Sequence, residues 1–245
     1  MVFNMSKSGE KKESKTAITQ EQETPQGPIA CVFTDIIDST SLWWDHPSQM
    51  CQALAQHDKI IRTILEAFNG YEVKATGDGF FIVFSSTTDA LNFCLHAQKE
   101  IQSAIWAPEV VDYIADDTST IDLARRPPRS RGLLVRMGIH YGYPSMSQKC
   151  PKTGRMDYFG TTINIAARVC AQANGAEIGV SDAFLGQLWR ETMDMDWEVD
   201  EALKQQVLET KVVNRGFEVE DQGWVMLKGV PDPVLLKIIF SVFYY

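Results

Sequence analysis

Two aspartates that are far apart in the sequence flank apolar runs in a way that could bring their carboxylates together. Asp35 ends the run 29–34, and Asp78 lies in the turn before the run 80–84. Two carboxylates at one point repel each other unless a cation lies between them, and Mg²⁺ prefers carboxylate oxygen while it keeps room for phosphate. Each aspartate alone also fits an ordinary role, as a helix cap or a turn residue. The pair predicts a two-metal site for phosphoryl chemistry.

Two other patterns suit a substrate that carries phosphate. The backbone N–H groups of 36–40 follow a strand and precede a helix, where they could form an anion cradle. Asn164 and Arg168 are four residues apart, so both project from one face of a helix and could stabilise charge on a phosphoryl group. Each pattern is weak alone, because similar turns are common and an exposed helix often carries a surface arginine.

The hydrophobic pattern indicates how the two aspartates are brought together. We expect a strand over 29–34, a helix that ends at Asn69 and Gly70, strands over 71–75 and 80–84, a helix over 89–105 and a strand over 133–140. This order is the split βαββαβ pattern of ferredoxin-like sheets, in which the first and third strands are neighbours. Asp35 and Asp78 should therefore converge at one edge of the sheet.

A second αβ portion follows the first four strands. We expect a helix over 161–173, a strand over 177–180, a helix from Ser181, and strands over 224–227 and 234–240. The stretches 108–131 and 143–155 look like insertions, the first of them a polar loop, and 194–216 is too mixed to assign. The predicted fold class is α/β (α+β), a ferredoxin-like βαββαβ palm core with an additional C-terminal αβ portion.

Composition excludes several classes of protein. The chain has 245 residues, of which 44% are apolar and 22% charged, as in an ordinary globular domain. Residues 1–27 are polar and predict a disordered lead or linker, which leaves 28–245 as one domain. The net charge of -9 argues against nucleic acid as a partner.

The cysteines and the apolar runs bear on the compartment. Five scattered cysteines predict no disulfide framework or zinc site and favour a reducing compartment. No apolar run reaches membrane-spanning length. We therefore expect a cytoplasmic catalytic domain with no membrane segment in this chain, and whether it belongs to a larger membrane-associated protein stays open.

Six short segments occur in order along the chain and resemble one family when they are taken together. They are 33–40 (FTDIIDST), 71–78 (YEVKATGD), 135–140 (VRMGIH), 156–160 (MDYFG), 164–168 (NIAAR) and 227–230 (LKGV). In this order they resemble the catalytic domain of class III nucleotidyl cyclases, especially the fungal and trypanosomatid adenylate cyclases. The resemblance covers about 28–240. Gly79, after the second aspartate, departs from the residue that is frequent in some relatives.

The resemblance implies a function for each end of a bound nucleotide. Asp35, Asp78 and the backbone carbonyl of Ile36 would hold Mg²⁺ or Mn²⁺, with two ions per active site. Lys74 and Asp157 would select the base. A lysine suits the N1 acceptor of adenine and a carboxylate suits its amino group, whereas guanine presents the reverse pattern.

The remaining family positions concern the phosphates. Asn164 and Arg168 match the transition-state pair, and Arg136 and Lys228 match the triphosphate-binding residues. The implied activity is conversion of ATP to 3′,5′-cyclic AMP and pyrophosphate. The implied assembly is a homodimer with two shared active sites, in which one subunit gives the metal residues and the other the base and transition-state residues. The nearby His140 receives no chemical role.

Three other functions stay open from the sequence. Lys74 and Asp157 argue against a guanylate cyclase. A polymerase or diguanylate cyclase shares the palm sheet but lacks the late segments 164–168 and 227–230. A catalytically silent nucleotide-binding regulatory partner usually lacks a metal aspartate or the transition-state arginine. The sequence does not identify a regulatory partner.

Overall fold

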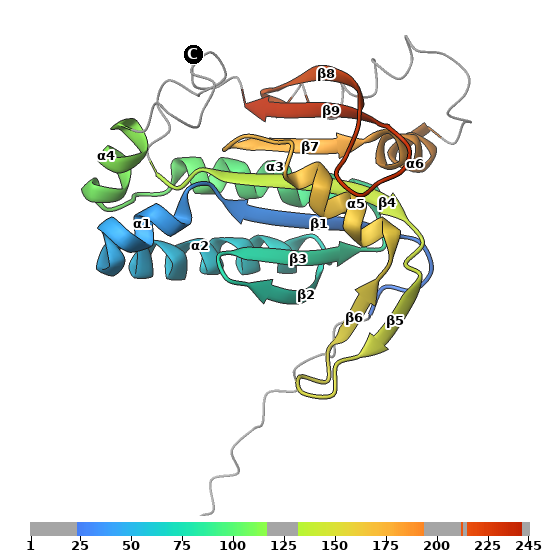
Figure 1. Cartoon of the computed structure of the whole chain (residues 1–245), viewed down its shortest axis with the longest axis horizontal. Helices are drawn as coiled ribbons and strands as arrows, with labels where there is room; N and C mark the ends of the chain where they lie inside the picture. Colours follow the sequence, from blue (N-terminus) through green and yellow to red (C-terminus); the bar gives the residue numbers. More distant parts are fainter. Residues whose placement is uncertain (1–23, 117–131, 194–211, 213–214, 242–245) are drawn as a thin grey trace, which may run out of the picture.

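The computed structural model describes residues 24–116, 132–193, 212 and 215–241 (Figure 1). Most of the predicted lead 1–27 lies outside this range, as do 117–131 and nearly all of 194–216. At the start of the described chain, the carbonyl of Pro25 accepts a hydrogen bond from the Tyr158 hydroxyl at 2.8 Å. Contacts with the domain thus begin slightly before the predicted boundary at residue 28.

A seven-stranded sheet has the order β2-β3-β1-β4-β7-β9-β8. β1 lies between β3 and β4 and is antiparallel to both, whereas β4 pairs with β7 in parallel. The prediction that the first and third strands are neighbours in the sheet is confirmed, and so is the predicted fold class. The strands are β1 (Ile29–Ile36), β2 (Tyr71–Thr76), β3 (Gly79–Phe84), β4 (Val135–Gly142), β7 (Glu177–Ser181), β8 (Phe217–Val225) and β9 (Val234–Ser241).

Helices cover both faces of the sheet, with α2 and α3 on one face and α5 on the other (Figure 1). Side chains of β1 alternate between these faces, as a strand requires. Ala30 and Val32 pack in the large core with α2 and α3, whereas Ile29 and Cys31 pack with Ala166 of α5. The helices are α1 (Ser39–Asp45), α2 (Pro47–Ala67), α3 (Thr87–Ser103), α4 (Pro108–Asp116), α5 (Thr161–Cys170) and α6 (Asp182–Met193).

A two-stranded hairpin projects from one end of the sheet as an arm (Figure 1). It consists of β5 (Met146–Lys149) and β6 (Met156–Phe159), which pair with each other in a second, separate sheet. The stretch 143–155 was expected to be an insertion. It provides the first strand of this hairpin, and the second strand carries Asp157.

Several predicted elements are wrong in part. The stretch 108–131 was expected to be a loop, but its first nine residues form α4, where Val110 is buried. β8 begins at Phe217, seven residues before the predicted start at 224. Three of its first five residues are acidic, so this half lacks the apolar pattern that indicates a strand. The residue that caps α1 is Asp38, whose side chain makes no capping bond to the backbone.

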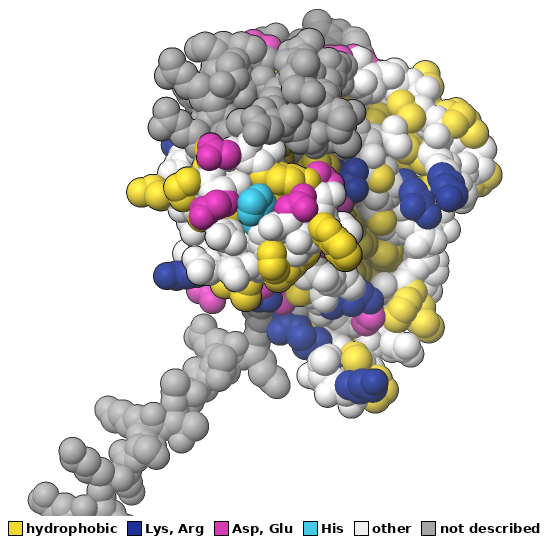
Figure 2. All heavy atoms as spheres, turned by 60° about the vertical axis from the view of Figure 1, so that its left-hand side comes forward, with side chains coloured by type: hydrophobic (Ala, Val, Ile, Leu, Met, Phe, Trp, Pro, Cys, Tyr) yellow, Lys and Arg dark blue, Asp and Glu magenta, His cyan; other side chains and the backbone are white. Residues whose placement is uncertain are grey.

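The distribution of charged side chains on the surface and the state of the cysteines agree with what the composition led us to expect. The face that Figure 2 turns forward scatters Lys and Arg among acidic and hydrophobic side chains and does not gather them in one patch. All five cysteines are free thiols. Within the described ranges, no helix combines the length and the apolarity that crossing a membrane requires.

Glu191 of α6 fastens that helix to the start of α3. Its carboxylate accepts hydrogen bonds from the N–H of Thr87 at 3.0 Å, the N–H of Thr88 at 3.2 Å and the hydroxyl of Ser86 at 3.1 Å. Burial acts to raise the pKa of Glu191, but the hydrogen bonds from Thr87 and Thr88 outweigh it, so the pKa is lowered. The carboxylate also complements the positive end of the α3 dipole.

Glu191→Ala should lower the free energy of unfolding by about 1 kcal/mol at neutral pH, the usual effect of removing a helix cap. Since the pKa is lower in the folded chain, this stabilisation is present above the unfolded pKa and is lost as pH falls through the folded pKa. Urea unfolding at neutral pH and in steps below the ordinary glutamate pKa of about 4.3 measures it. The control is Glu66→Ala on the exposed side of α2. A difference from wild type that is independent of pH would contradict the role of the ionised carboxylate.

Candidate metal and nucleotide site

The end of β1 and the turn between β2 and β3 lie against each other. Phe33 pairs with Phe81, and the N–H of Phe80 donates a hydrogen bond to the Thr34 hydroxyl at 3.0 Å. A Cβ on Gly79 would overlap with the Thr34 carbonyl oxygen, so only glycine fits there. This close approach explains the departure at Gly79, and it sets the turn that holds Asp78 beside the end of β1.

The two aspartates offer a donor set that fits a hard divalent cation. The Asp78 Oδ2 atom is buried and has no hydrogen-bond partner among the described residues, an arrangement that a folded protein rarely leaves without a ligand. The described residues contain no group of three or more His, Cys, Asp or Glu that could hold a metal ion. An ion held by Asp35, Asp78 and the Ile36 carbonyl would therefore take its other ligands from water and phosphate, as Mg²⁺ does.

Arg136 of β4 lies directly across from Asp35 of β1. The two residues are register partners, and the Asp35 Oδ2 atom accepts from the arginine Nε at 2.9 Å and from Nη2 at 2.5 Å. They line a pocket of about 200 Å³. A ligand pocket for a small molecule usually has about 300–1,000 Å³, so this pocket suits ions and a phosphate group better than a whole nucleotide. Its other lining residues are Phe33, Thr34, Thr76, Gly79, Ala167, Cys170 and Ala171.

The structure brings the predicted base-selecting pair together. Lys74 of β2 donates to both carboxylate oxygens of Asp157 of β6, with Nζ–O distances of 2.8 and 3.0 Å. The Lys74 ammonium lies 5.9 Å from the ring centroid of Phe81 and 5.7 Å from that of Phe159. A cationic donor and an anionic acceptor thus stand side by side. Phe81 is buried and stacked on Phe33, whereas Phe159 is partly exposed beside the lysine.

The predicted transition-state and phosphate residues form a second contact. The Arg168 Nε atom donates to the backbone carbonyl of Lys228 at 3.1 Å, which joins α5 to the turn between β8 and β9. Arg168, Lys228 and Asn164 are all exposed. None of the three lines the pocket that holds Asp35 and Arg136. The nine predicted site residues therefore fall into separate groups within one chain, and the two triphosphate residues lie in different groups.

The turn at 36–40 gives no support to the expected phosphate cradle. Asp38 has a left-handed backbone with φ of 53° and ψ of 27°. Its carboxylate accepts hydrogen bonds from the hydroxyls of Ser41 and Tyr113, each at 2.7 Å. A carboxylate at this position disfavours an anion there. Sequence patterning gave no sign of this contact, because Tyr113 lies in the stretch that was expected to be a loop.

His140 is buried and has a structural role in the core. Its Nδ1 atom lies 2.7 Å from the Ser181 hydroxyl, which joins β4 to β7. Burial lowers the pKa of His140 to about 4, so the ring is neutral at neutral pH. This agrees with the absence of a chemical role in the sequence analysis.

Arg155 is a residue near the site that the sequence analysis did not single out. It precedes Asp157 by two positions and donates through Nε to the Glu72 carbonyl at 2.7 Å. Only its nearness to the 156–160 segment could have drawn attention to it.

A βαββαβ sheet with one aspartate at the end of β1 and another in the turn between β2 and β3 defines a palm-type catalytic domain. Residues 21–232 match the family model described as adenylate and guanylate cyclase catalytic domain. The chain belongs to this family.

Adenylate cyclases from fungi and trypanosomes are similar to the chain. That of Neurospora crassa is 34% identical over 238 residues, which are 92% of this chain and 10% of that protein. That of Schizosaccharomyces pombe is 34% identical over 233 residues, 94% of this chain and 13% of that protein. The chain thus spans about a tenth of the length of these relatives. A solved structure of Trypanosoma brucei adenylate cyclases in their monomeric state has 28% identity and a TM-score of 0.69, and the match covers 90% of this chain and 91% of that one.

Asp78→Asn should abolish the stabilisation of the chain by Mg²⁺ or Mn²⁺. At a metal concentration of tenfold the Kd, an ion that binds only the folded wild type adds about 1.4 kcal/mol. Without metal the variant should be as stable as wild type or more stable, because a neutral amide costs less free energy to bury than a carboxylate that lacks a partner. Thermal unfolding with and without metal measures both effects. Asp112→Asn, an exposed position on α4, is the control, and equal metal stabilisation of Asp78→Asn and wild type would exclude Asp78 as a ligand.

Proposed function

We propose that the chain is an adenylate cyclase domain that converts ATP to 3′,5′-cyclic AMP and pyrophosphate. The observation that supports this most directly is the contact of Lys74 with Asp157. The two residues come from different sheets and are 83 positions apart. Their contact puts together the donor and the acceptor that adenine requires.

Base selection follows from the hydrogen-bonding groups of this pair. The Lys74 ammonium can only donate, and it suits the N1 acceptor of adenine. The Asp157 carboxylate can only accept, and it suits the exocyclic amino group. Guanine presents a donor at N1 and an acceptor at its exocyclic oxygen, so it would leave both partners unpaired.

At the other end of the nucleotide, the chain supplies charges for the phosphates. Asp35, Asp78 and the Ile36 carbonyl would hold divalent ions, which would lower the pKa of the ribose 3′ hydroxyl and neutralise charge on the leaving group. Arg136 and Lys228 would bind the triphosphate by charge-assisted hydrogen bonds. Members of the family generally use divalent ions, and the proposal has two ions, Mg²⁺ or Mn²⁺, in each site.

The reaction needs no nucleophile from the protein. The ribose 3′ oxygen attacks the α-phosphorus, the bond from this phosphorus to the α,β-bridging oxygen breaks, and the hydroxyl proton passes to solvent as pyrophosphate leaves. Asn164 and Arg168 would stabilise the charge that grows on the phosphoryl oxygens. Because nucleophile and electrophile belong to one molecule, positioning can supply about 7–11 kcal/mol of the barrier reduction.

The proposed assembly is a homodimer with two shared sites. One chain carries both sets of residues, but the pocket beside Asp35 is small, and Asn164 and Arg168 are outside it. A two-fold partner would place its base and transition-state residues opposite the metal residues of the first chain, twice over. We also propose that 28–245 form a single catalytic domain after the lead 1–27. This domain would lie in the cytoplasm, where ATP is available.

The substrate is tested by Lys74→Glu combined with Asp157→Cys. Wild type should form cyclic AMP from ATP, and the double variant should lower the ATP-to-GTP ratio of kcat/KM by at least about a hundredfold, since mismatched polar groups are then left unpaired. Cyclic product is measured with each nucleotide and with Mg²⁺ or Mn²⁺. Cyclic GMP as the main wild-type product would establish a guanylate cyclase, and no product at all would favour a silent nucleotide-binding partner.

Mixing two inactive variants tests the shared site. Asp78→Ala and Arg168→Ala should each be nearly inactive, and their mixture should regain about a quarter of wild-type activity. Random pairing makes half of the dimers mixed, and each mixed dimer holds one intact site of two. Asn164→Ala mixed with Arg168→Ala is the control and should stay inactive, because both changes remove the same set. An inactive first mixture in which mixed dimers have formed would refute the shared site.

A further inference from the structure

The base-selecting pair is divided between two sheets that do not share a strand. Lys74 belongs to β2, at the edge of the main sheet, and Asp157 belongs to β6 of the arm. No backbone ladder sets the distance between the two side chains. The position of Asp157 relative to Lys74 therefore depends on the contacts that fasten the arm to β2.

The direct contact between Lys74 and Asp157 cannot fasten the arm while a nucleotide is bound. In the proposed complex, the Lys74 ammonium turns to the ring nitrogen of adenine and the Asp157 carboxylate turns to the amino group. Their ion pair, with Nζ–O distances of 2.8 and 3.0 Å, is then exchanged for bonds to the base. Another contact has to hold the arm when selection takes place.

Arg155 makes this other contact from the start of β6. Its Nε atom donates to the Glu72 carbonyl at 2.7 Å, and its Nη2 atom donates to the same oxygen. Its guanidinium lies 4.8 Å from the centroid of the Tyr71 ring, and the Met156 N–H donates to the Tyr71 hydroxyl at 2.8 Å. Both acceptors lie on β2, two and three residues before Lys74.

The Glu72 carbonyl that Arg155 contacts lies on an edge strand beside a bulge. Glu72 pairs with Ile82 and Lys74 with Phe81, so Val73 is an extra residue without a register partner of its own. β2 is at the end of the strand order, and its outer side carries backbone groups that no strand ladder satisfies. A bulge also redirects side chains, and here it lies immediately before Lys74.

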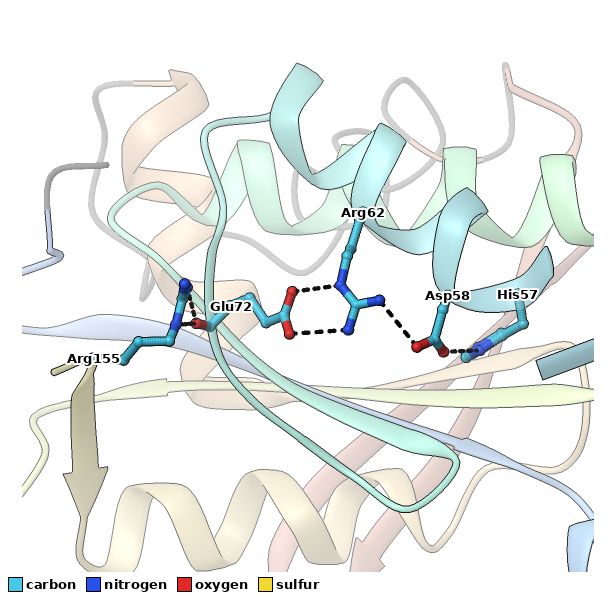
Figure 3. Close-up of polar contacts among 5 residues, drawn as sticks. All are labelled: His57, Asp58, Arg62, Glu72 and Arg155. Atoms are coloured by element: carbon cyan, nitrogen blue, oxygen red, sulfur yellow. Dashed lines mark hydrogen bonds and ion pairs between the residues drawn. The ribbon is translucent and has the colours of Figure 1, made fainter. Parts of the chain in front are cut away.

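The side chain of Glu72 connects β2 to α2 (Figure 3). Its two oxygens accept from Arg62, at 2.9 Å from Nε and 3.2 Å from Nη2. The Arg62 Nη1 atom donates in turn to Asp58 at 3.0 Å, and its guanidinium lies 5.0 Å from the Phe80 ring centroid. A two-bond arginine–carboxylate contact fixes direction as well as distance.

We propose that Glu72 is a positioning residue for base selection. Its side chain and its backbone carbonyl together connect the arm to α2. Its side chain is bound to Arg62 and its carbonyl to Arg155, so the bulge and the arm keep Asp157 at the distance from Lys74 that one purine edge requires. Neither Glu72 nor Arg62 touches the nucleotide. This inference rests on the proposed adenylate cyclase function.

The test compares Glu72→Ala, Arg62→Ala and the double variant with wild type. Each single variant should raise the KM for ATP by about fivefold to tenfold and lower the ATP-to-GTP ratio of kcat/KM by a similar factor, with a smaller change in kcat, because a displaced carboxylate loses its aligned bond to the base. The double variant should be no worse than either single one, since the two residues act through one contact. Glu72→Gln, which keeps an acceptor for Arg62, should recover most of the ratio.

Hydrogen exchange reports the arm without any turnover. In Glu72→Ala and Arg62→Ala the Met156 amide should exchange faster, because its acceptor is on β2, whereas the Ile139 amide in β4 of the main sheet should keep its wild-type rate. Arg62→Ala leaves the sequence of β2 unchanged, so it serves if Glu72→Ala fails to fold. Glu66→Ala, also on α2, is the control for lost charge.

The outcomes separate this inference from the proposed function. A wild-type ATP-to-GTP ratio in both single variants would overturn it, even if Met156 exchange changes. Unchanged Met156 exchange would also overturn it. Wild-type protein that forms no cyclic AMP from ATP would refute the proposed function, and Met156 exchange would still decide whether Glu72 fastens the arm.

Discussion

The pairing of β1 with β3 on one side and β4 on the other is the constraint on which the phosphate end of the site depends. The antiparallel register puts Arg136 directly across from Asp35, and it brings the turn that contains Asp78 against the end of the same strand. The approach is so close that residue 79 has no room for a side chain. Three charged residues from three segments are thereby set by backbone hydrogen bonds, which are more rigid than side-chain contacts.

Two acidic residues of the proposed site are paired with basic ones in the chain without nucleotide. Asp35 is bound to Arg136, and Asp157 to Lys74. A chain with a net charge of -9 repels an anion at long range, so attraction of a triphosphate has to come from such local cations. In the proposed complex, each of these basic residues would exchange a carboxylate for a group of the substrate. The free chain therefore keeps these charges compensated, and their desolvation in the complex is offset by new partners.

The sequence predicted the parts of the fold that have a clear hydrophobic period. β1, the hairpin of β2 and β3, α3, α5, β7 and β9 were found within a few residues, and the convergence of Asp35 and Asp78 followed from topology alone. Polar or short elements were missed. The first half of β8 carries acidic residues on a sheet edge, α4 lies in a stretch with prolines, and the arm consists of two strands of four residues each. The contact of Arg155 with Glu72 could not be predicted, because it depends on a bulge and on the docking of the arm.

The separation of the arm from the main sheet has a consequence for the descent of such domains. Of the residues proposed to bind the metal ions and phosphates, Asp35 and Arg136 are built into the central strands β1 and β4, where a replacement disturbs the pairing of β1 with its neighbours. The residues proposed to choose the purine lie on an edge strand and on the arm, which has a sheet of its own. Preference for one purine over the other can therefore change by a few replacements in lineages that leave the reaction itself intact.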